Sequence, residues 1–286
     1  MDTRFLETLL AVLEQGSIAE AGRHQNLSAA AVTQRIRALE AEIGQPLVMR
    51  VGRTVRPTEL GTSVADKARS LLNEVRGLGD GMTTDPLRGT LRLGAMSTAT
   101  TGLLPPVLRR LATRYPGIEA YILPGTSRDL YDRVLKGELD AALIIEPPFA
   151  LSKTCDCRVV REEKLVLLVQ PEFAGADPLA LMGRLPFIRY DRSTWGGMLA
   201  TRWLEAAGIV PHERYELDAL DAIATFVHQG LGIAIVPDWA PPWPEGLVLA
   251  KLPLPTYSIT RKIQLVWGRG SPRSSLIKAF LEVLSD

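Results

Sequence analysis

The stretch that decides the N-terminal fold is residues 16–61, GSIAEAGRHQNLSAAAVTQRIRALEAEIGQPLVMRVGRTVRPTELG. Within it, Ser17 and Glu20 have the spacing of a helix capping box, so a short helix is predicted to begin there. Ser28 predicts the cap of a longer helix, and Gly44 predicts its end because glycine readily adopts the left-handed conformation of a helix C-terminus. The stretch therefore predicts two successive helices joined by a tight turn.

Elements on either side complete this N-terminal pattern. Apolar residues between Phe5 and Leu13 recur every three or four positions, which predicts one more helix before the capped pair. After Pro46, two short runs alternate between apolar and polar residues around Gly52, which is typical of a β-hairpin. Three helices followed by a hairpin predict an all-α winged helix-turn-helix domain over residues 1–58.

Charge distinguishes this region from the rest of the chain. The whole chain is nearly neutral, with 33 basic and 32 acidic residues and a net charge of +1. Between Arg23 and Pro57, however, the basic residues are all arginine and outnumber the acidic ones. Arginine suits phosphate groups and base edges. Charge alone leaves two interpretations open, a nucleic-acid interface and an ordinary solvated helix face.

A second helical pattern follows the hairpin. Apolar residues from Leu60 to Leu78 recur every three or four positions, which predicts a long helix. A solitary helix of this length with an apolar seam needs a partner, and the simplest partner is a second copy of itself. We therefore expect a linker and dimerisation helix at residues 59–84, a hinge at 85–90 and a further domain at 91–286.

Beyond the hinge, expected strands alternate with expected helices. This alternation predicts an α/β domain with parallel sheets, whose ligand sites lie at the carboxyl ends of the strands. The expected strands are 90–94, 118–123, 140–145, 164–169, 186–190, 232–236 and 262–267.

The composition excludes several classes of protein. A hydrophobic share of 46% excludes wholesale disorder, and no apolar run is long enough to span a membrane. Cys155 and Cys157 flank a single residue, so they cannot form a disulfide framework, and without nearby histidines they make at most half a zinc site. Acidic residues near the start argue against a targeting signal. We expect a cytoplasmic protein without a cofactor or a metal.

The chain resembles the LysR-type transcriptional regulators over essentially its whole length. The resemblance rests on residues 16–61 and on the later runs LRLGAMSTATTGLLPPVL, ELDAALI and GLGIAIVP. It implies an N-terminal DNA reader, a dimerising linker helix, an α/β effector domain with two lobes like periplasmic binding proteins, and assembly as a dimer of dimers. The first lobe is expected at residues 91–163 with 266–286, and the second at residues 164–265. The run AVTQRIRALE is most similar to the arginine/lysine-responsive branch that controls amino-acid export.

The expected DNA contacts lie at the start of the longer helix and in the hairpin. Where the family usually has glutamine and often proline, this chain has Ala29 and Ala30, which can touch a thymine methyl but cannot hydrogen-bond a base edge. Direct readout is therefore expected mainly from Thr33 and Gln34. Arg37 is expected to meet phosphate unless it pairs with Glu40 or Glu42. The expected DNA-binding residues are Ser28, Ala29, Ala30, Thr33, Gln34, Arg37, Arg50 and Arg53.

The expected effector contacts follow the ends of strands. Hydroxyl groups and free N–H groups at helix N-termini bind carboxylates, although ordinary capping is an alternative role. Across the cleft, Asp191 or Asp221 suits an ammonium group, so the pair of lobes suits a zwitterion. Trp195 is interpreted either as a cation–π wall or as a lid-packing residue. The expected effector-binding residues are Ser97, Thr98, Thr100, Thr101, Gly125, Thr126, Ser127, Arg189, Asp191, Ser193, Trp195 and Asp221.

Together these features indicate a ligand-responsive, sequence-specific DNA-binding transcriptional regulator rather than an enzyme. Its expected partners are double-stranded DNA, a small carboxylate or amino-acid effector, and further copies of the chain in a dimer or tetramer. The alternative is an α/β enzyme fused to a DNA-binding domain that regulates its own gene. That alternative requires a titrating acid, base or nucleophile in the interlobe cleft, and no such catalytic motif stands out in the sequence.

Overall fold

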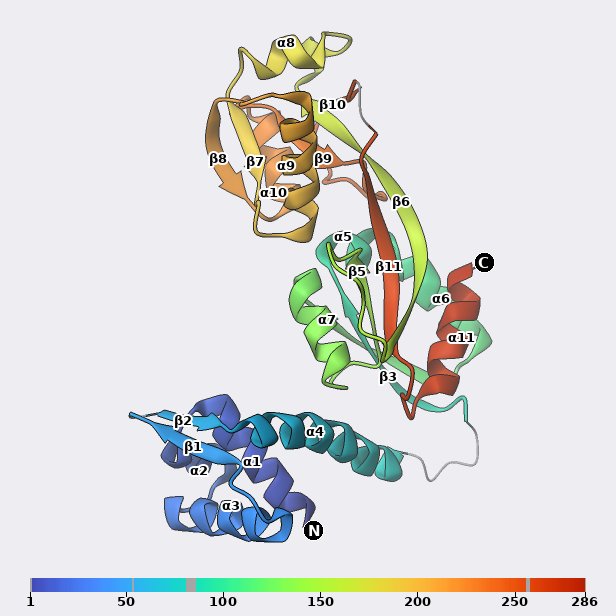
Figure 1. Ribbon diagram of the computed structural model, residues 1–286. Helices are drawn as coiled ribbons and strands as arrows, with labels where there is room; N and C mark the ends of the chain where they lie inside the picture. Colours follow the sequence, from blue (N-terminus) through green and yellow to red (C-terminus); the bar gives the residue numbers. More distant parts are fainter. Residues whose placement is uncertain (1, 53, 81–85, 256–257, 286) are drawn as a thin grey trace. The chain divides into compact units, whose positions relative to one another are not determined.

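The structure is a computed structural model that describes residues 2–52, 54–80, 86–255 and 258–285. The chain divides into two compact units, with the main break after residue 84 (Figure 1). The first unit is mostly helical, and the second contains the larger sheet.

The N-terminal unit begins with the helices α1 (Thr3–Gln15), α2 (Ile18–Gln25) and α3 (Ala29–Ile43). The two predicted caps are confirmed, because Ser17 Oγ accepts a hydrogen bond from the N–H of Glu20 and Ser28 Oγ accepts one from the N–H of Ala31. Helix α3 ends at Gly44, whose φ of 84° is left-handed. Local chemistry thus sets both ends of α3.

The predicted hairpin follows as β1 (Val48–Val51) and β2 (Thr54–Pro57), which pair antiparallel. Helix α4 (Glu59–Asp80) begins directly afterwards. A Cβ atom at Gly61 would lie 1.8 Å from the carbonyl oxygen of Leu47, so only glycine lets α4 start this close to the segment before the hairpin. These elements confirm the predicted winged helix-turn-helix.

The apolar residues of helix α4 differ in burial. Ala68 and Leu72 are buried in the core of the N-terminal unit, next to residues from α1 and α3. Leu71 and Val75 remain exposed at 45% and 41% of their surface. The last four positions of the expected linker helix, 81–84, lie outside the described residues.

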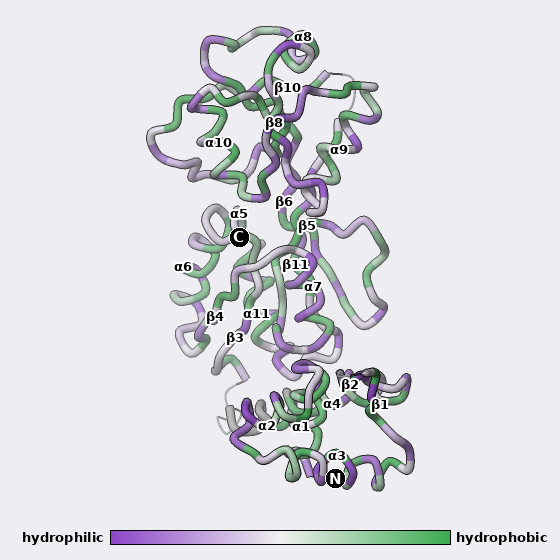
Figure 2. Tube along the Cα trace, turned by 90° about the vertical axis from the view of Figure 1, so that its left-hand side faces the viewer, coloured by the Kyte–Doolittle hydropathy of each residue, from purple (hydrophilic) through white to green (hydrophobic). Residues whose placement is uncertain are grey.

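The first lobe of the C-terminal unit is built on three strands, β3 (Gly89–Ala95), β4 (Ile118–Pro124) and β5 (Ala141–Ile145). They pair in parallel, as predicted. Helices α6 (Leu104–Arg114), α7 (Ser127–Leu135) and α11 (Ser274–Ser285) pack against this lobe. Hydrophobic and hydrophilic residues alternate along the helices of this unit in Figure 2, as expected of helices that bury one face. Strand β3 starts two residues before the expected start of the domain, because its first two residues already pair with β4.

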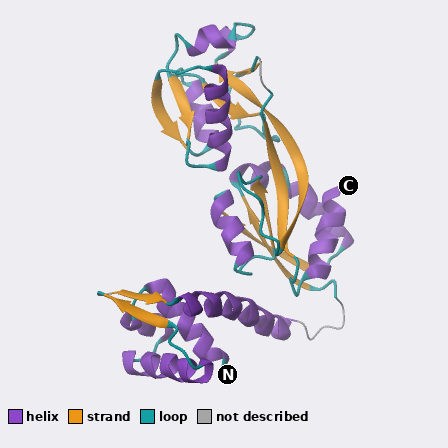
Figure 3. Cartoon of the chain, in the orientation of Figure 1, coloured by secondary structure: helices purple, strands orange, loops and turns teal. Residues whose placement is uncertain are grey.

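Two long strands cross from one lobe into the other (Figure 3). Strand β11 (Thr260–Gly268) lies antiparallel to β5 and to β6 (Cys155–Val169), so the expectation of purely parallel sheets is wrong. The sequence predicted only residues 164–169 of β6, because the first part exposes polar residues. The lobe boundary expected after residue 265 also falls earlier, since Ile263 and Leu265 are buried in the core of the first lobe.

The second lobe extends from the far end of β6, which pairs with β9 (Ala234–Pro237) and β10 (Ala250–Pro253). A separate parallel pair consists of β7 (Phe187–Tyr190) and β8 (Glu213–Leu217). The helices of this lobe are α8 (Pro178–Met182), α9 (Trp195–Ala207) and α10 (Leu220–His228). The sequence did not predict α8, β8 or β10, which are short and partly exposed.

Candidate functional sites

Helix α3 turns one face to solvent at its N-terminal end. Ala29, Ala30, Gln34 and Arg37 are exposed, and Thr33 is half-buried. Residues three or four positions apart lie on the same side of an α-helix, so these five side chains form one continuous face. The opposite side of α3 carries the residues that the core buries.

The polar side chains of this face differ in their partners. Thr33 Oγ donates a hydrogen bond to the carbonyl oxygen of Ala29 at 2.8 Å. The side chains of Gln34 and Arg37 make no hydrogen bond or ion pair with another described residue. Glu40, one of the acids considered as a partner of Arg37, instead accepts hydrogen bonds from two backbone N–H groups before the hairpin. The amide of Gln34 and the guanidinium of Arg37 therefore face solvent.

The hairpin adds further cations. Arg50 is exposed on β1, and Arg56 is exposed on β2 opposite Met49. Arg53, which was expected at the tip, lies outside the described residues. Arg56 was not among the expected contacts, although its place in the alternating pattern of the hairpin could have indicated it.

One arginine of the basic region has a structural role instead. Arg35 is half-buried and donates a hydrogen bond to Thr8 Oγ at 3.2 Å. The Thr8 side chain is fully buried, and its hydroxyl lies 3.0 Å from Gln25 Oε1. Arg35 thus joins α1 to α3, and the local excess of arginine overstates the charge available to a partner.

In the C-terminal unit, the first hydroxyl cluster lies on the short helix α5 (Ser97–Gly102). Thr100 and Thr101 donate hydrogen bonds to helix carbonyl groups one turn earlier. Thr98 is buried, and its Oγ accepts a hydrogen bond from Arg261 Nη2 at 3.2 Å. Ser97 is exposed. Three of the four expected hydroxyl ligands therefore have partners within the protein.

The second hydroxyl cluster caps helix α7. Thr126 Oγ accepts a hydrogen bond from the N–H of Asp129 at 3.2 Å and donates one to Asp129 Oδ2 at 3.0 Å. Ser127 is buried and accepts from the N–H of Ile145. Gly125 packs closely on Leu130. Capping, the alternative role considered for these hydroxyls, is present in the structure.

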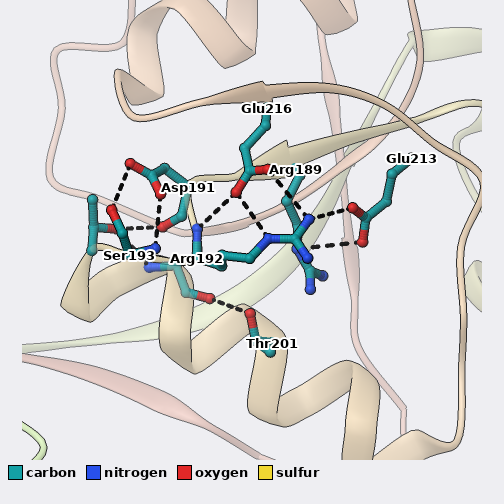
Figure 4. A network of polar contacts seen from close by, with 9 residues as sticks. Arg189, Asp191, Arg192, Ser193, Thr201, Glu213 and Glu216 are labelled. Atoms are coloured by element: carbon teal, nitrogen blue, oxygen red, sulfur yellow. Dashed lines mark hydrogen bonds and ion pairs between the residues drawn. The ribbon is translucent and has the colours of Figure 1, made fainter.

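The expected charged residues of the second lobe form a network (Figure 4). Asp191 accepts hydrogen bonds from the N–H of Ser193 at 2.8 Å and from its hydroxyl at 3.0 Å. Arg192 pairs with Glu216 and Glu213, and these hydrogen bonds raise the pKa of Arg192 and lower that of Glu216. Arg189 is buried, with Nε 3.5 Å from Glu213 Oε1. Asp221 is exposed on the first turn of α10 and accepts from the N–H of Ala222 at 3.0 Å.

A buried ion pair that sequence reasoning missed lies on the two crossing strands. Arg261 on β11 and Glu163 on β6 are 1% and 2% exposed, with Arg261 Nε 2.7 Å from Glu163 Oε2. Glu163 Oε1 also accepts from Arg161 Nε at 3.1 Å and from the N–H of Ala240 at 3.2 Å. Because Arg261 also contacts Thr98 on α5, one network links the first lobe, both crossing strands and a loop of the second lobe.

Of two buried aromatic residues in the second lobe, one also connects the lobes. Tyr190 is buried, and this burial raises the pKa of its phenol. Trp195 begins α9 of the second lobe, yet its ring packs among the core of the first lobe, 5.6 Å from Phe149 and 6.3 Å from Tyr131. Trp195 was interpreted either as a cation–π wall or as a packing residue, and in the structure its ring packs against aromatic residues of the first lobe.

The cysteines show no site among the described residues. Cys155 is buried, which raises the pKa of its thiol, while Cys157 is exposed. The described ranges contain no group of three or more histidine, cysteine or acidic residues suited to a metal ion. Within the same ranges, no helix has both the length and the apolar character needed to cross a bilayer.

Two family models match the chain. Residues 3–62 match the bacterial regulatory helix-turn-helix protein of the lysR family, and residues 84–286 match the LysR substrate binding domain. The chain belongs to the LysR family of transcriptional regulators. This regulator is therefore a ligand-responsive, sequence-specific DNA-binding protein, with its DNA-binding domain in the N-terminal unit and its effector-binding domain in the C-terminal unit.

Individual proteins agree with this assignment. The probable HTH-type transcriptional regulator LrrA of Synechococcus elongatus is 30% identical, covering 99% of this chain and 96% of its own. Full-length OxyR from Pseudomonas aeruginosa has a TM-score of 0.68 at 19% identity, over 99% of this regulator and 94% of that chain. LysG from Corynebacterium glutamicum with bound effector Arg has a TM-score of 0.64 at 18% identity, over 100% and 98% of the two chains. The two structures share its fold.

Proposed function

We propose that helix α3 reads base edges in the major groove and that the hairpin holds the phosphate backbone. The observation that supports this is the solvent-facing pair of Gln34 and Arg37, which have no partner among the described residues. A glutamine amide can form two hydrogen bonds with adenine, and arginine suits phosphate or guanine. Ser28, Arg50 and Arg53 complete the proposed interface by contacting phosphate groups.

Selection from a random-sequence duplex library with the full chain tests this proposal. The regulator should enrich one family of sequences, and its affinity for them should exceed that for random duplexes by at least a thousandfold. Affinity for both should fall as salt rises, because phosphate contacts release counterions. Equal binding to every duplex would contradict the proposed reading role of α3.

We also propose that α4 joins two copies of the chain. Its exposed Leu71 and Val75 lie one turn apart and supply an apolar strip beside the buried side of the helix. Two such strips, packed against each other in a coiled coil, would remove both from water. The proposal extends to a dimer of dimers as the full assembly.

We propose that the effector binds between the lobes, next to the network of Thr98, Arg261 and Glu163. This network touches both lobes, so a ligand beside it would change how they are held. Ser97 and Asp221 are the most available of the expected contacts, because both are exposed. Among the other expected contacts, Asp191, Ser193 and the serine and threonine hydroxyls already take part in hydrogen bonds within the protein. Arg189 differs from them, because its buried Nε and Nη1 have no hydrogen-bond partner among the described residues.

A carboxylate or an amino acid is the proposed effector class. Hydroxyl groups on the first lobe suit a carboxylate, and Asp221 on the second lobe suits an ammonium group. LysG, whose structure holds Arg as its effector, has the same fold. We accordingly propose that this regulator functions like the arginine/lysine-responsive branch of the family.

Thermal unfolding of the full chain with single amino acids and small carboxylates tests this class. The five tryptophans all lie between Trp195 and Trp267, so intrinsic fluorescence follows the C-terminal unit alone. A ligand at 100 times its Kd stabilises the native state by about 2.7 kcal/mol. The Asp221→Asn variant should lose the shift caused by an amino acid and keep that caused by a plain carboxylate. No shift with either class would contradict the proposal.

We further propose that this regulator works in the cytoplasm and performs no catalysis. DNA binding supports the first part, because the DNA of a bacterial cell lies in the cytoplasm. The names of its relatives, which are transcriptional regulators, support the second. Recovery of the identified effector unchanged after prolonged incubation with the protein is the expected result.

A further inference from the structure

The exposed side chains in the first turn of α3 offer only methyl groups to a partner. Ala29 and Ala30 are both exposed, and they are the first two residues of the helix after its cap. Neither side chain can donate or accept a hydrogen bond. The next residue on this face, Thr33, stands one turn further along.

Thr33 extends this apolar character because its hydroxyl hydrogen is already engaged. Thr33 Oγ donates to the carbonyl oxygen of Ala29 at 2.8 Å, so the side chain offers a partner only an acceptor and its methyl group. Side-chain donors on the exposed face therefore begin with Gln34, at the second turn. Ser28 Oγ accepts from the helix N–H of Ala31, which leaves its own hydrogen for a phosphate.

The major groove has one apolar group that matches such a surface. Of the four bases, only thymine carries a methyl group there, and the groups that distinguish the other bases are hydrogen-bond donors and acceptors. An alanine placed over a polar edge removes water from that edge and gives nothing back, which is unfavourable. An alanine placed over a thymine methyl buries apolar surface on both sides.

We infer that the first turn of α3 selects DNA by thymine methyl groups, through Ala29 and Ala30, and that hydrogen-bond readout begins only at Gln34. The inference rests on the proposed docking of α3 in the major groove. It assigns to the two alanines a part in sequence selection, although they lack any polar group. Each half-site is then expected to contain thymines whose replacement by a base without a C5 methyl group weakens binding.

Deoxyuridine tests this directly, because it keeps the base pairing and polar edge of thymidine and lacks only the methyl group. The duplex is the one selected by the full chain from a random-sequence library, with each thymidine replaced in turn. A buried methyl group is worth about fourfold in affinity, so at least one position should lose about fourfold. The matching replacement in both half-sites should lose about fifteenfold. Binding to a random duplex should not change.

Glycine variants assign the methyl contact to its residue. In Ala29→Gly and Ala30→Gly, the ratio of affinities for the thymidine and deoxyuridine duplexes should fall toward one at the position that the missing methyl covered. Comparing two duplexes with the same variant cancels any loss of helix stability. Gln34→Ala is the matched control, because it should weaken binding to both duplexes and preserve their ratio.

The possible outcomes separate this inference from the function on which it rests. A selected sequence that tolerates deoxyuridine at every position overturns the inference and leaves DNA reading by α3 intact. A deoxyuridine penalty that persists in both glycine variants also overturns it, because other residues then contact the methyl groups. Failure to enrich any sequence overturns both the inference and the proposed reading role.

Discussion

Replacing Glu163 with glutamine is expected to destabilise the C-terminal unit far more than a surface substitution would. In the parent, the carboxylate faces the guanidinium of Arg261, which is 1% exposed. Arg161 and the N–H of Ala240 also donate to Glu163. Glutamine keeps the shape but removes the negative charge, so the Arg261 cation stays buried without compensation.

The magnitude follows from the burial of both partners. Breaking a buried ion pair by removing one partner costs about 3–5 kcal/mol. For a unit of about 200 residues, each kcal/mol lowers Tm by about 2–4 °C. Glu163→Gln should therefore lower the Tm of the C-terminal unit by about 6–20 °C. Arg261 makes a further bond to Thr98 Oγ, which leaves part of its hydrogen bonding intact and favours the lower end of this range.

Tryptophan fluorescence during thermal unfolding is the appropriate assay, because all five tryptophans belong to this unit. Glu162→Gln is the matched control, since Glu162 is the exposed neighbour on the same strand, and its Tm should stay within about 2 °C of the parent. The double variant Glu163→Leu with Arg261→Met removes both charges and should recover most of the loss. A Tm of Glu163→Gln within 2 °C of the parent, or a double variant no more stable than the single one, would refute the reasoning.

Three further predictions concern the other parts of the molecule. Gln34→Ala should weaken binding to the selected duplex by roughly 1–3 kcal/mol and leave binding to random duplexes nearly unaffected. Arg37→Ala should weaken binding to both kinds of duplex and lower the slope of log K against log salt by about 0.9. Equal effects of the two variants on both duplexes would contradict the assignment. Leu71→Asp should shift the mass measured by sedimentation toward that of the monomer, because it places two charges, one from each copy, in an apolar seam. Thr62→Asp on the same helix should leave the mass unchanged. A mass unchanged by Leu71→Asp means that α4 is not the seam. Burial raises the pKa of Asp140 above its ordinary value of 3.8, so the folded state favours the protonated carboxyl. The parent should therefore lose stability relative to Asp140→Asn as the pH rises from 3.8 through the folded pKa. Urea unfolding midpoints that change with pH in the same way in both proteins between pH 4 and 7 would disprove the shift.

Local sequence signals were sufficient for the N-terminal unit. Ser17, Ser28 and Gly44 fix helix ends through contacts with residues three or four positions away, and the structure confirms the two caps and the helix end at Gly44. The exposed face of α3 could also be predicted, because a helical period places Gln34 and Arg37 opposite the buried stripe. The direction of Arg35 could not, since its partner Thr8 lies on another helix.

The effector-binding domain depended more on tertiary structure. Its parallel strands β3, β4 and β5 were predicted, because each contains several apolar residues in a short run between helical patterns. The polar first part of β6 was missed, because that strand segment is stabilised by pairing with β11, from near the other end of the chain. The same pairing brings Glu163 and Arg261 together across 98 positions. The sequence by itself determined the family, the helix ends and the exposed face of α3, since these depend on neighbours along the chain. Only the tertiary structure decided which charges are buried and which hydroxyls are engaged, because those depend on strands and loops that meet through folding.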